Sequence, residues 1–346
     1  MSQTFRLPHA GTLLRLNKTP QSPNAATLGT QVSTKLTVNG FVKYIALRLT
    51  GSLVVGTNPG TVFSEAPLGL IRRIDFVTSD NTVLQSWTGE TLYRYNHFMR
   101  HKAARRVAPS GAVGTNAFSA TLFLDQEALA FLDPSESLHD PTRWKDIYVN
   151  ITWGQATDIA VAGGGGTIAI AAGAQVAITV NQVMEGLGQI EYDHIHSFVE
   201  IPVTASNTSL ETDIPGIGSL AGVLIQQTRQ AAVGPVPVDN IVNDVTFQAG
   251  GIQFHVNRIP WTELQDDNVS DFQLDGAAVL GNPIPGYAYL RLDDNRSLAS
   301  IYNVRAMNKP KLVLNVTRTS DTEMVRLCWD FFRLHPLALE RMAASA

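Results

Sequence analysis

The sequence is poor in charged residues, in cysteine and in long apolar runs. Only 16% of its 346 residues are charged, against a usual fraction of about 25%, so we expect much of the surface to contact other protein. The net charge of -4 gives no basic excess for bulk binding to nucleic acid. The single cysteine, Cys328, excludes an internal disulfide and lies in an apolar run, which predicts a buried structural thiol.

Signals for a membrane or for secretion are also missing. No apolar stretch reaches the roughly 18 residues that span a bilayer. The first residues lack the charged start and continuous apolar segment of a signal peptide. We therefore expect synthesis in the cytosol.

A strand pattern recurs in the two halves of the chain. Residues 70–76 read Leu-Ile-Arg-Arg-Ile-Asp-Phe, and residues 241–247 read Ile-Val-Asn-Asp-Val-Thr-Phe, with apolar residues at the same four places. Two further pairs follow in the same order and at nearly the same offset: residues 120–125 with 288–293, and residues 148–152 with 313–317. The simplest explanation is two copies of one all-β domain in a single chain.

The remaining pattern divides the chain into four parts. Proline and small polar residues over residues 1–30 predict an extended arm, with a disordered tail as the alternative. Residues 31–190 and 191–336 are the two predicted domains, and residues 337–346 form a C-terminal tail that could be a short helix.

Helices are expected at equivalent places in the two halves. Apolar residues recur at helical spacing over residues 92–99 behind Thr88, which predicts a capped helix. Residues 261–264 predict a shorter counterpart in the second half. Residues 155–175 and 265–285 are expected to be long loops, and long loops inside compact domains usually serve contact or function.

Two histidines are the best candidate for a metal site. His194 and His196 lie on one face of an extended segment, where they could chelate a metal with Asp193 or Glu191. Such a pair in a linker is usually incidental, so we assign no metal ligand.

Other clusters offer no stronger chemistry. Four glycines at 163–166 lack the Lys-Ser/Thr of a phosphate-binding loop and predict a flexible connection. Asp125 and Asp293 could approach each other as a carboxylate pair, but their recurrence in both halves favours a structural role. Four acidic residues have the wrong spacing for the twelve-residue calcium loop: Asp266, Asp267, Asp271 and Asp275. A basic cluster is interpreted as a solvated helix end, with a phosphate or partner site as the alternative: Arg100, His101, Lys102, Arg105 and Arg106. We therefore predict no catalytic, cofactor-binding or metal-binding residue and no enzyme.

The duplicated unit resembles the double jelly-roll major capsid proteins of tailless icosahedral viruses, the lineage of membrane-containing phages and adenovirus. The resemblance is carried by the two strand sets and by the strand-turn-strand-helix passage from Leu70 to Tyr95, with its echo over residues 241–264. It covers residues 31–336 and implies an all-β fold of two tandem jelly-roll sandwiches with short helices.

The resemblance also implies partners. The family forms homotrimers that are pseudo-hexagonal capsomers of an icosahedral shell, so the expected location is the virion capsid, made in the host cytoplasm. Neighbouring capsomers and minor virion proteins are implied partners, an internal membrane is left open, and no sequence-specific nucleic-acid binding is expected. Residues 1–29 and 337–346 would make inner contacts, and the two long loops would form towers or trimer contacts.

Two other functions stay open. A carbohydrate-binding or carbohydrate-cleaving double β-sandwich shares the architecture but needs an exposed aromatic platform. The tryptophans are instead scattered among predicted core strands: Trp87, Trp144, Trp153, Trp261 and Trp329. A minor or spike protein of a virion is the second alternative.

Overall fold

Antiparallel strands make up most of the chain, as the alternating apolar patterns predict. The computed structural model describes residues 16–127, 137–140, 146–183, 192–231, 234–250, 252–253, 258–274, 282–292, 301–319 and 322–334. Within these ranges the α-helices are α1 (Gly89–Met99) and α2 (Trp261–Phe272). Neither is long and apolar enough to cross a bilayer.

The first half of the chain forms a sandwich of two sheets. One sheet has the order β1 (Leu16–Pro20), β13 (Gln175–Val183), β4 (Phe41–Val55), β9 (Gly114–Asp125) and β8 (Arg106–Val107), with β2 (Asn24–Ala25) and β12 (Ile168–Ile170) attached. The facing strands are β3 (Gln31–Leu36), β10 (Ile147–Trp153), β6 (Ile71–Thr78) and β7 (Val83–Trp87). A small pair, β5 (Thr61–Val62) and β11 (Ala160–Val161), lies apart from both sheets.

The second half repeats this plan. Its first set of strands is β14 (Tyr192–Pro202), β24 (Glu323–Leu334) and β16 (Ser219–Ala231), with β17 (Gly234–Pro237), β21 (Tyr287–Arg291) and β22 (Tyr302–Asn303) paired to β16. The second set is β15 (Asn207–Asp213), β23 (Lys311–Val316) and β18 (Val242–Ala249), with β19 (Ile252–Gln253) and β20 (Ile259–Pro260) beside β18.

Strand pairing confirms the predicted duplication. In the first half Phe76 of β6 lies opposite Val149 of β10, and in the second half Phe247 of β18 lies opposite Leu312 of β23. The sequence alignment had matched residue 149 with residue 314, so its third strand pair was displaced by two positions. A displacement of two keeps the same side chains facing inward, which is why the apolar pattern could not detect it.

The helices differ from expectation in one respect. The α1 helix begins where predicted, because the Thr88 hydroxyl accepts a hydrogen bond from the backbone N–H of Thr91. The α2 helix, however, is not short: it continues to Phe272, so residues 265–272 are helical and the predicted loop over residues 265–285 is wrong there. The glycines at 163–166 do lie in a connection, between β11 and β12.

Several predicted segments fall partly or wholly outside the described residues. Of the arm, residues 16–30 are described, and β1 pairs with β13 at the edge of the first sandwich. The tail at 337–346, the boundary near residue 190 and residues 275–281 of the predicted loop are not among them.

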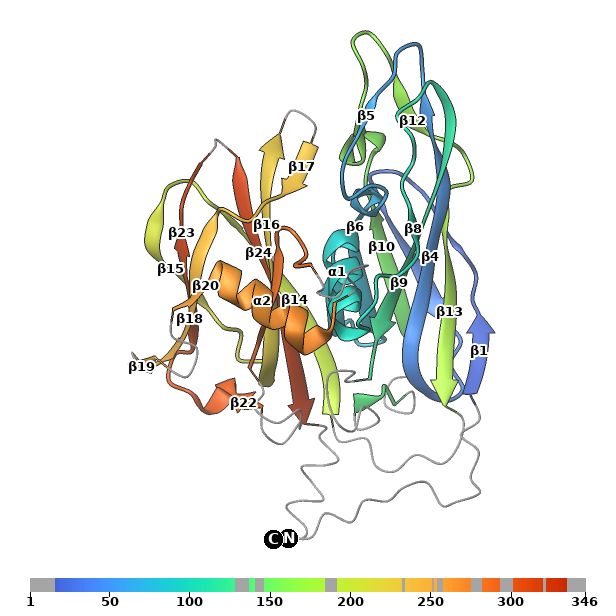
Figure 1. Cartoon of the computed structure of the whole chain (residues 1–346). Helices are drawn as coiled ribbons and strands as arrows, with labels where there is room; N and C mark the ends of the chain where they lie inside the picture. The colour runs from blue at the N-terminus through green and yellow to red at the C-terminus, as the bar shows by residue number, and fades with distance from the viewer. Residues whose placement is uncertain are drawn as a thin grey trace.

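The two sandwiches share one continuous sheet. Strand β14 of the second sandwich lies parallel to β7 of the first, where His196 pairs with Gln85, and a ten-stranded sheet results. Figure 1 shows α1 between the two sandwiches, where it packs on β6 and β9 on one side and on β16 and α2 on the other. The first apolar core takes in Leu224, Tyr287 and Tyr289 of the second sandwich. We call this contact the seam, formed by β6, β7 and α1 on one side and by β14, β16, β21 and β24 on the other.

Candidate functional site: the seam between the sandwiches

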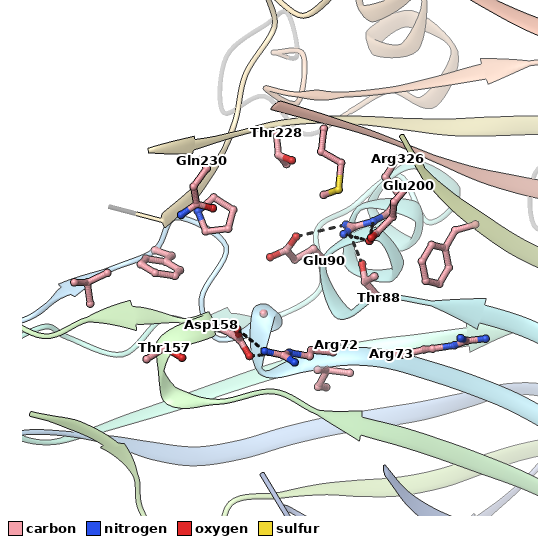
Figure 2. Close-up of a pocket in the computed structure, with 17 residues that line it drawn as sticks. Arg72, Arg73, Thr88, Glu90, Thr157, Asp158, Glu200, Thr228, Gln230 and Arg326 are labelled. Atoms are coloured by element: carbon pink, nitrogen blue, oxygen red, sulfur yellow. Dashed lines mark hydrogen bonds and ion pairs between the residues drawn. The ribbon is translucent and has the colours of Figure 1, made fainter. Parts of the chain in front are cut away.

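A cavity of about 700 Å³ opens at the seam and is lined from both sandwiches. Figure 2 shows the polar side chains that point into it, with β6 and the start of α1 on one side and β14, β16 and β24 on the other. The labelled lining residues are Arg72, Arg73, Thr88, Glu90, Thr157, Asp158, Glu200, Thr228, Gln230 and Arg326.

Arg326 bridges the two sandwiches at the inner end of this cavity. Its guanidinium donates to Glu200 Oε1 at 2.9 Å and to Gln226 Oε1 on its own side. Across the seam it donates to Thr88 Oγ1 at 3.4 Å and lies 3.8 Å from Glu90 Oε2 (Figure 2). Burial works to lower the pKa of Arg326, but Glu90 and Glu200 together hold it above its usual value. The cation therefore stays charged and holds two carboxylates.

The other arginines of the cavity are also engaged. Arg72 makes a bidentate pair with Asp158, at 3.0 and 3.1 Å (Figure 2). Arg73 donates to Asp75 Oδ1 at 2.8 Å and has its guanidinium 5.9 Å from the centre of the Phe198 ring. These guanidinium groups already have carboxylate partners, so they are not available to bind an anion. The cavity is therefore a place where ion pairs stabilise the contact between the two sandwiches.

A second polar cluster is buried deeper in the seam. His194 Nε2 lies 2.8 Å and His196 Nε2 lies 3.2 Å from the same oxygen, Asp330 Oδ1. The other oxygen, Oδ2, accepts from the hydroxyls of Tyr95 at 2.8 Å and Tyr289 at 2.9 Å. The histidine side chains are each 1% exposed and that of Asp330 is 5% exposed. Tyr95 comes from α1, so the cluster also crosses the seam.

Burial sets the protonation states in this cluster. Burial and, to a smaller extent, neighbouring His194 lower the pKa of His196 to about 4 against the opposing effect of Asp330, so the ring of His196 is neutral at neutral pH. Burial alone would raise the pKa of Asp330, but His196 and His194 hold it well below its usual range. Burial and the nearby Asp330 carboxylate raise the pKa of Tyr95 well above its usual value. The cluster is a carboxylate held by two tyrosine hydroxyls and flanked by two imidazoles.

The sequence pointed to the histidines but not to their partner. His194 and His196 are inside β14 rather than in a linker, and they do share one face. Asp193 instead pairs with Arg333 at 3.1 Å, and Glu191 is outside the described residues. Asp330 was missed because it lies on β24, 136 positions from His194. The sequence feature that could have marked Asp330 is that it is an acidic residue within an otherwise apolar part of its strand.

The basic cluster after α1 is partly neutralised by structural partners. Arg100 pairs with buried Asp125 and its guanidinium lies 4.0 Å from the centre of the Phe123 ring. Arg106 pairs with Glu65. Exposed Lys102 and Arg105 remain at the surface, and His101 contacts the carbonyl of residue 272. The solvated helix end that we favoured is therefore wrong for Arg100, which is a structural ion pair.

The remaining candidates show no convergent site among the described residues. Asp125 is engaged by Arg100, and its proposed partner Asp293 is outside the described residues. Asp266, Asp267 and Asp271 are exposed on α2, and Asp275 is not described. Cys328 is buried, as predicted. The described tryptophans are buried in the cores and offer no aromatic platform: Trp87, Trp153, Trp261 and Trp329.

Comparison with solved structures identifies the architecture. A chain of Sulfolobus turreted icosahedral virus is 16% identical with a TM-score of 0.71, and the match covers 95% of this chain and 93% of that chain. The major capsid protein P2 of bacteriophage PM2 is 12% identical with a TM-score of 0.60, covering 93% of this chain and 98% of that chain. The chain has the double jelly-roll fold.

The double jelly roll also matches a chain of the PBCV-1 virus capsid, at 11% identity, a TM-score of 0.59, and coverage of 93% of this chain and 95% of that chain. No protein-family model and no curated protein sequence matches this chain. The two tandem jelly rolls that the family resemblance implied are therefore confirmed as a fold. Because the matches span both rolls, the seam lies inside the shared architecture.

Proposed function

We propose that this chain is the major capsid protein of a tailless icosahedral virus. The observation that carries the proposal is the extent of the match: a virion chain superposes over 95% of this chain and 93% of its own length. Both rolls and their placement side by side are thus included, rather than one sandwich alone. A structural role in the capsid of a virion follows for this chain.

Three copies, we further propose, form one capsomer. Two rolls per chain and three chains give six similar sandwiches around one axis, which approximates a hexagon. The seam supports this role because its ion pairs and buried cluster hold the two rolls in a fixed relation, as a tile with six corners requires. A charged fraction of 16% suits a molecule whose flanks are covered by neighbouring subunits.

The division of labour within the chain is part of the same proposal. Residues 31–190 and 191–336 are the two rolls, with β1 and β2 added to the first roll by their pairing with β13. The remaining parts of the segments before and after the rolls contact neighbouring capsomers, minor virion proteins or a membrane beneath the shell. No enzymatic activity is assigned to the chain.

The test is the solution mass of the full-length protein by light scattering, with negative-stain imaging of the same peak. One chain has a mass of 37.5 kDa, so a trimer is expected near three times that value, about 112 kDa. The images should show a hexagonal outline. A protein that remains monomeric at tens of micromolar, and yields no hexagonal particles, would contradict the proposal.

Two further outcomes separate the alternatives. Trimers with an elongated outline would instead favour a spike or minor virion protein. Clear saccharide binding by a monomer on a glycan array would favour the carbohydrate-binding alternative, although the buried tryptophans speak against it.

A further inference from the structure

The Asp330 carboxylate is buried inside the seam. Its partners are the hydroxyls of Tyr95 and Tyr289 and the imidazoles of His194 and His196. Among the described residues no lysine or arginine makes an ion pair with it. Buried carboxylates are costly unless they are paired or coordinate a metal, because hydrogen bonds replace only part of the hydration that they lose.

Strand pairing brings three donor atoms to one point. His196 of β14 lies directly opposite Asp330 of β24 in the ladder, and His194 is two residues along on the same face. One donor atom from each residue lies within 4.8 Å of the other two. His196 Nε2 is fully buried and lies 3.2 Å from Asp330 Oδ1, in a geometry that is poor for a hydrogen bond.

We propose that His194, His196 and Asp330 bind a divalent transition-metal ion of the zinc type. Two imidazole nitrogens and one carboxylate oxygen are a donor set that suits zinc. Zinc bonds of about 2.1 Å at tetrahedral angles place neighbouring donor atoms about 3.4 Å apart. The donors lie 2.8 and 3.2 Å from the shared oxygen, so they need to move away from it by about 0.6 and 0.2 Å to reach this spacing.

The surroundings fit a structural ion. The rings of Trp87 and Tyr95 lie 4.4 and 4.9 Å from that of His196, centre to centre, and Phe332 stacks on His194 at 4.4 Å. Tyr95 and Tyr289 hold the outer oxygen of Asp330, and hydrogen bonds of this kind orient ligating carboxylates.

The ion would fasten the seam. Its three ligands belong to the second roll, whereas Tyr95, which holds the ligating carboxylate, comes from α1 of the first roll. His196 also pairs with Gln85 at the junction of the continuous sheet. Occupancy therefore stabilises the second roll and its attachment to the first at one point.

The experiment measures metal uptake by the full-length protein. The protein is stripped with a chelator, dialysed against zinc or cobalt chloride, freed of excess ion and analysed by inductively coupled plasma mass spectrometry. We expect one ion per chain, the visible absorption of tetrahedral cobalt, and a higher melting temperature for the loaded protein than for the stripped one. A wild-type chain that takes up neither ion, and melts at the same temperature with and without them, would overturn the proposal.

Variants separate this site from adventitious binding. Asp330→Asn keeps the shape and still accepts from the two tyrosines, and we expect it to bind zinc at least about 100-fold more weakly, since even outer partners change affinity by about 10 to 100-fold. Tyr95→Phe should lower the affinity for zinc about 10-fold or more, because it removes only the hydrogen bond to the outer oxygen of Asp330. The control is His101→Gln, an exposed histidine outside the cluster, which should bind as the wild type does. Equal zinc binding by Asp330→Asn and wild type would refute the assignment. If Asp330→Asn fails to fold, Tyr95→Phe and the wild-type measurement decide.

Discussion

Asp125 shows how one buried side chain can make stability depend on pH. It ends β9 and pairs with Arg100 and Asn96 of α1, so the first roll places a carboxylate under its own helix. The pKa of Asp125 is raised to about 6, mainly by burial and in small part by Glu127, although Arg100 and, more weakly, His194 act to lower it. The group therefore holds its proton in the folded chain at pH values where the unfolded chain has lost it.

The sign of the effect follows from proton linkage. Between about pH 4 and pH 6 the folded state binds more protons than the unfolded state at this position, so raising the pH lowers the free energy of unfolding. The expected slope is up to about 1.4 kcal/mol per pH unit, and it levels off above pH 6. Urea unfolding across this window should show the slope in the wild type and its loss in Asp125→Asn. Asp266→Asn, at an exposed position of α2, should keep the wild-type slope. Identical slopes for Asp125→Asn and wild type would contradict the prediction.

At the scale of single elements, β16 contains a glycine, Gly222, at a position where any side chain would clash with Tyr289. The pairing of β16 with β24 shifts register between Leu220 and Gly222. A Cβ at Gly222 would lie 2.4 Å from the Tyr289 hydroxyl oxygen, and that hydroxyl is held by Asp330. The Tyr289 ring cannot move aside without giving up its hydrogen bond in the seam.

Gly222→Ala is therefore expected to lower the free energy of unfolding by about 2 kcal/mol, the usual range for overpacking a core. The matched control is Gly164→Ala, since a Cβ there meets nothing within 4 Å, and its effect should stay within about 0.5 kcal/mol. Denaturant midpoints at constant slope give both values. Equal midpoints for the two variants would show that the Tyr289 side chain can move away from the added methyl group, and would contradict the prediction.

Elements whose cores are apolar were predictable from sequence, whereas only the first turn of α2, residues 261–264, was predicted and its continuation to Phe272 was not. Its inward face carries Gln265 and Asn268 among apolar residues, so the helical period is broken. Both amides are buried because they bond to the backbone: Gln265 to the carbonyl of Ile284, and Asn268 to the N–H and C=O of Tyr289. Buried amide side chains that hydrogen-bond to the backbone of another segment give a polar sequence, and such a sequence is predicted as a loop when that other segment is unknown.

The site was beyond sequence reasoning for a related reason. The histidine pair is visible as a spacing of two residues, but Asp330 becomes its neighbour only through the pairing of β14 with β24. The repeat analysis matched strands between the two halves, which gives no information on pairs within one half. Arg326 was missed in the same way, because its partners lie on both sides of the seam.

At the scale of the whole molecule, Arg326 couples the two rolls. Arg326→Leu leaves Glu90 facing Glu65 without its nearest cation across the seam. We expect the free energy of unfolding to fall by about 2 kcal/mol, less than for a fully buried pair because Glu200 is 45% exposed. We also expect the single unfolding transition to broaden or split as the rolls uncouple. The control, Lys311→Leu, breaks the exposed pair with Glu211 and should leave the free energy of unfolding close to that of the wild type, because solvent screens an exposed ion pair. Calorimetry that shows equal, single transitions for both variants would contradict this coupling.

The position of β24 in its sheet has a consequence for synthesis on the ribosome. This strand lies between β14 and β16, yet it is the last described strand to be made. The first roll has all its described strands once residue 183 has emerged, because β13 fills the corresponding place between β1 and β4. Until residues 323–334 follow, β14 and β16 have unpaired edges that invite association with other nascent chains. Chains that terminate before residue 323 should therefore contain a complete first roll and an aggregation-prone second one.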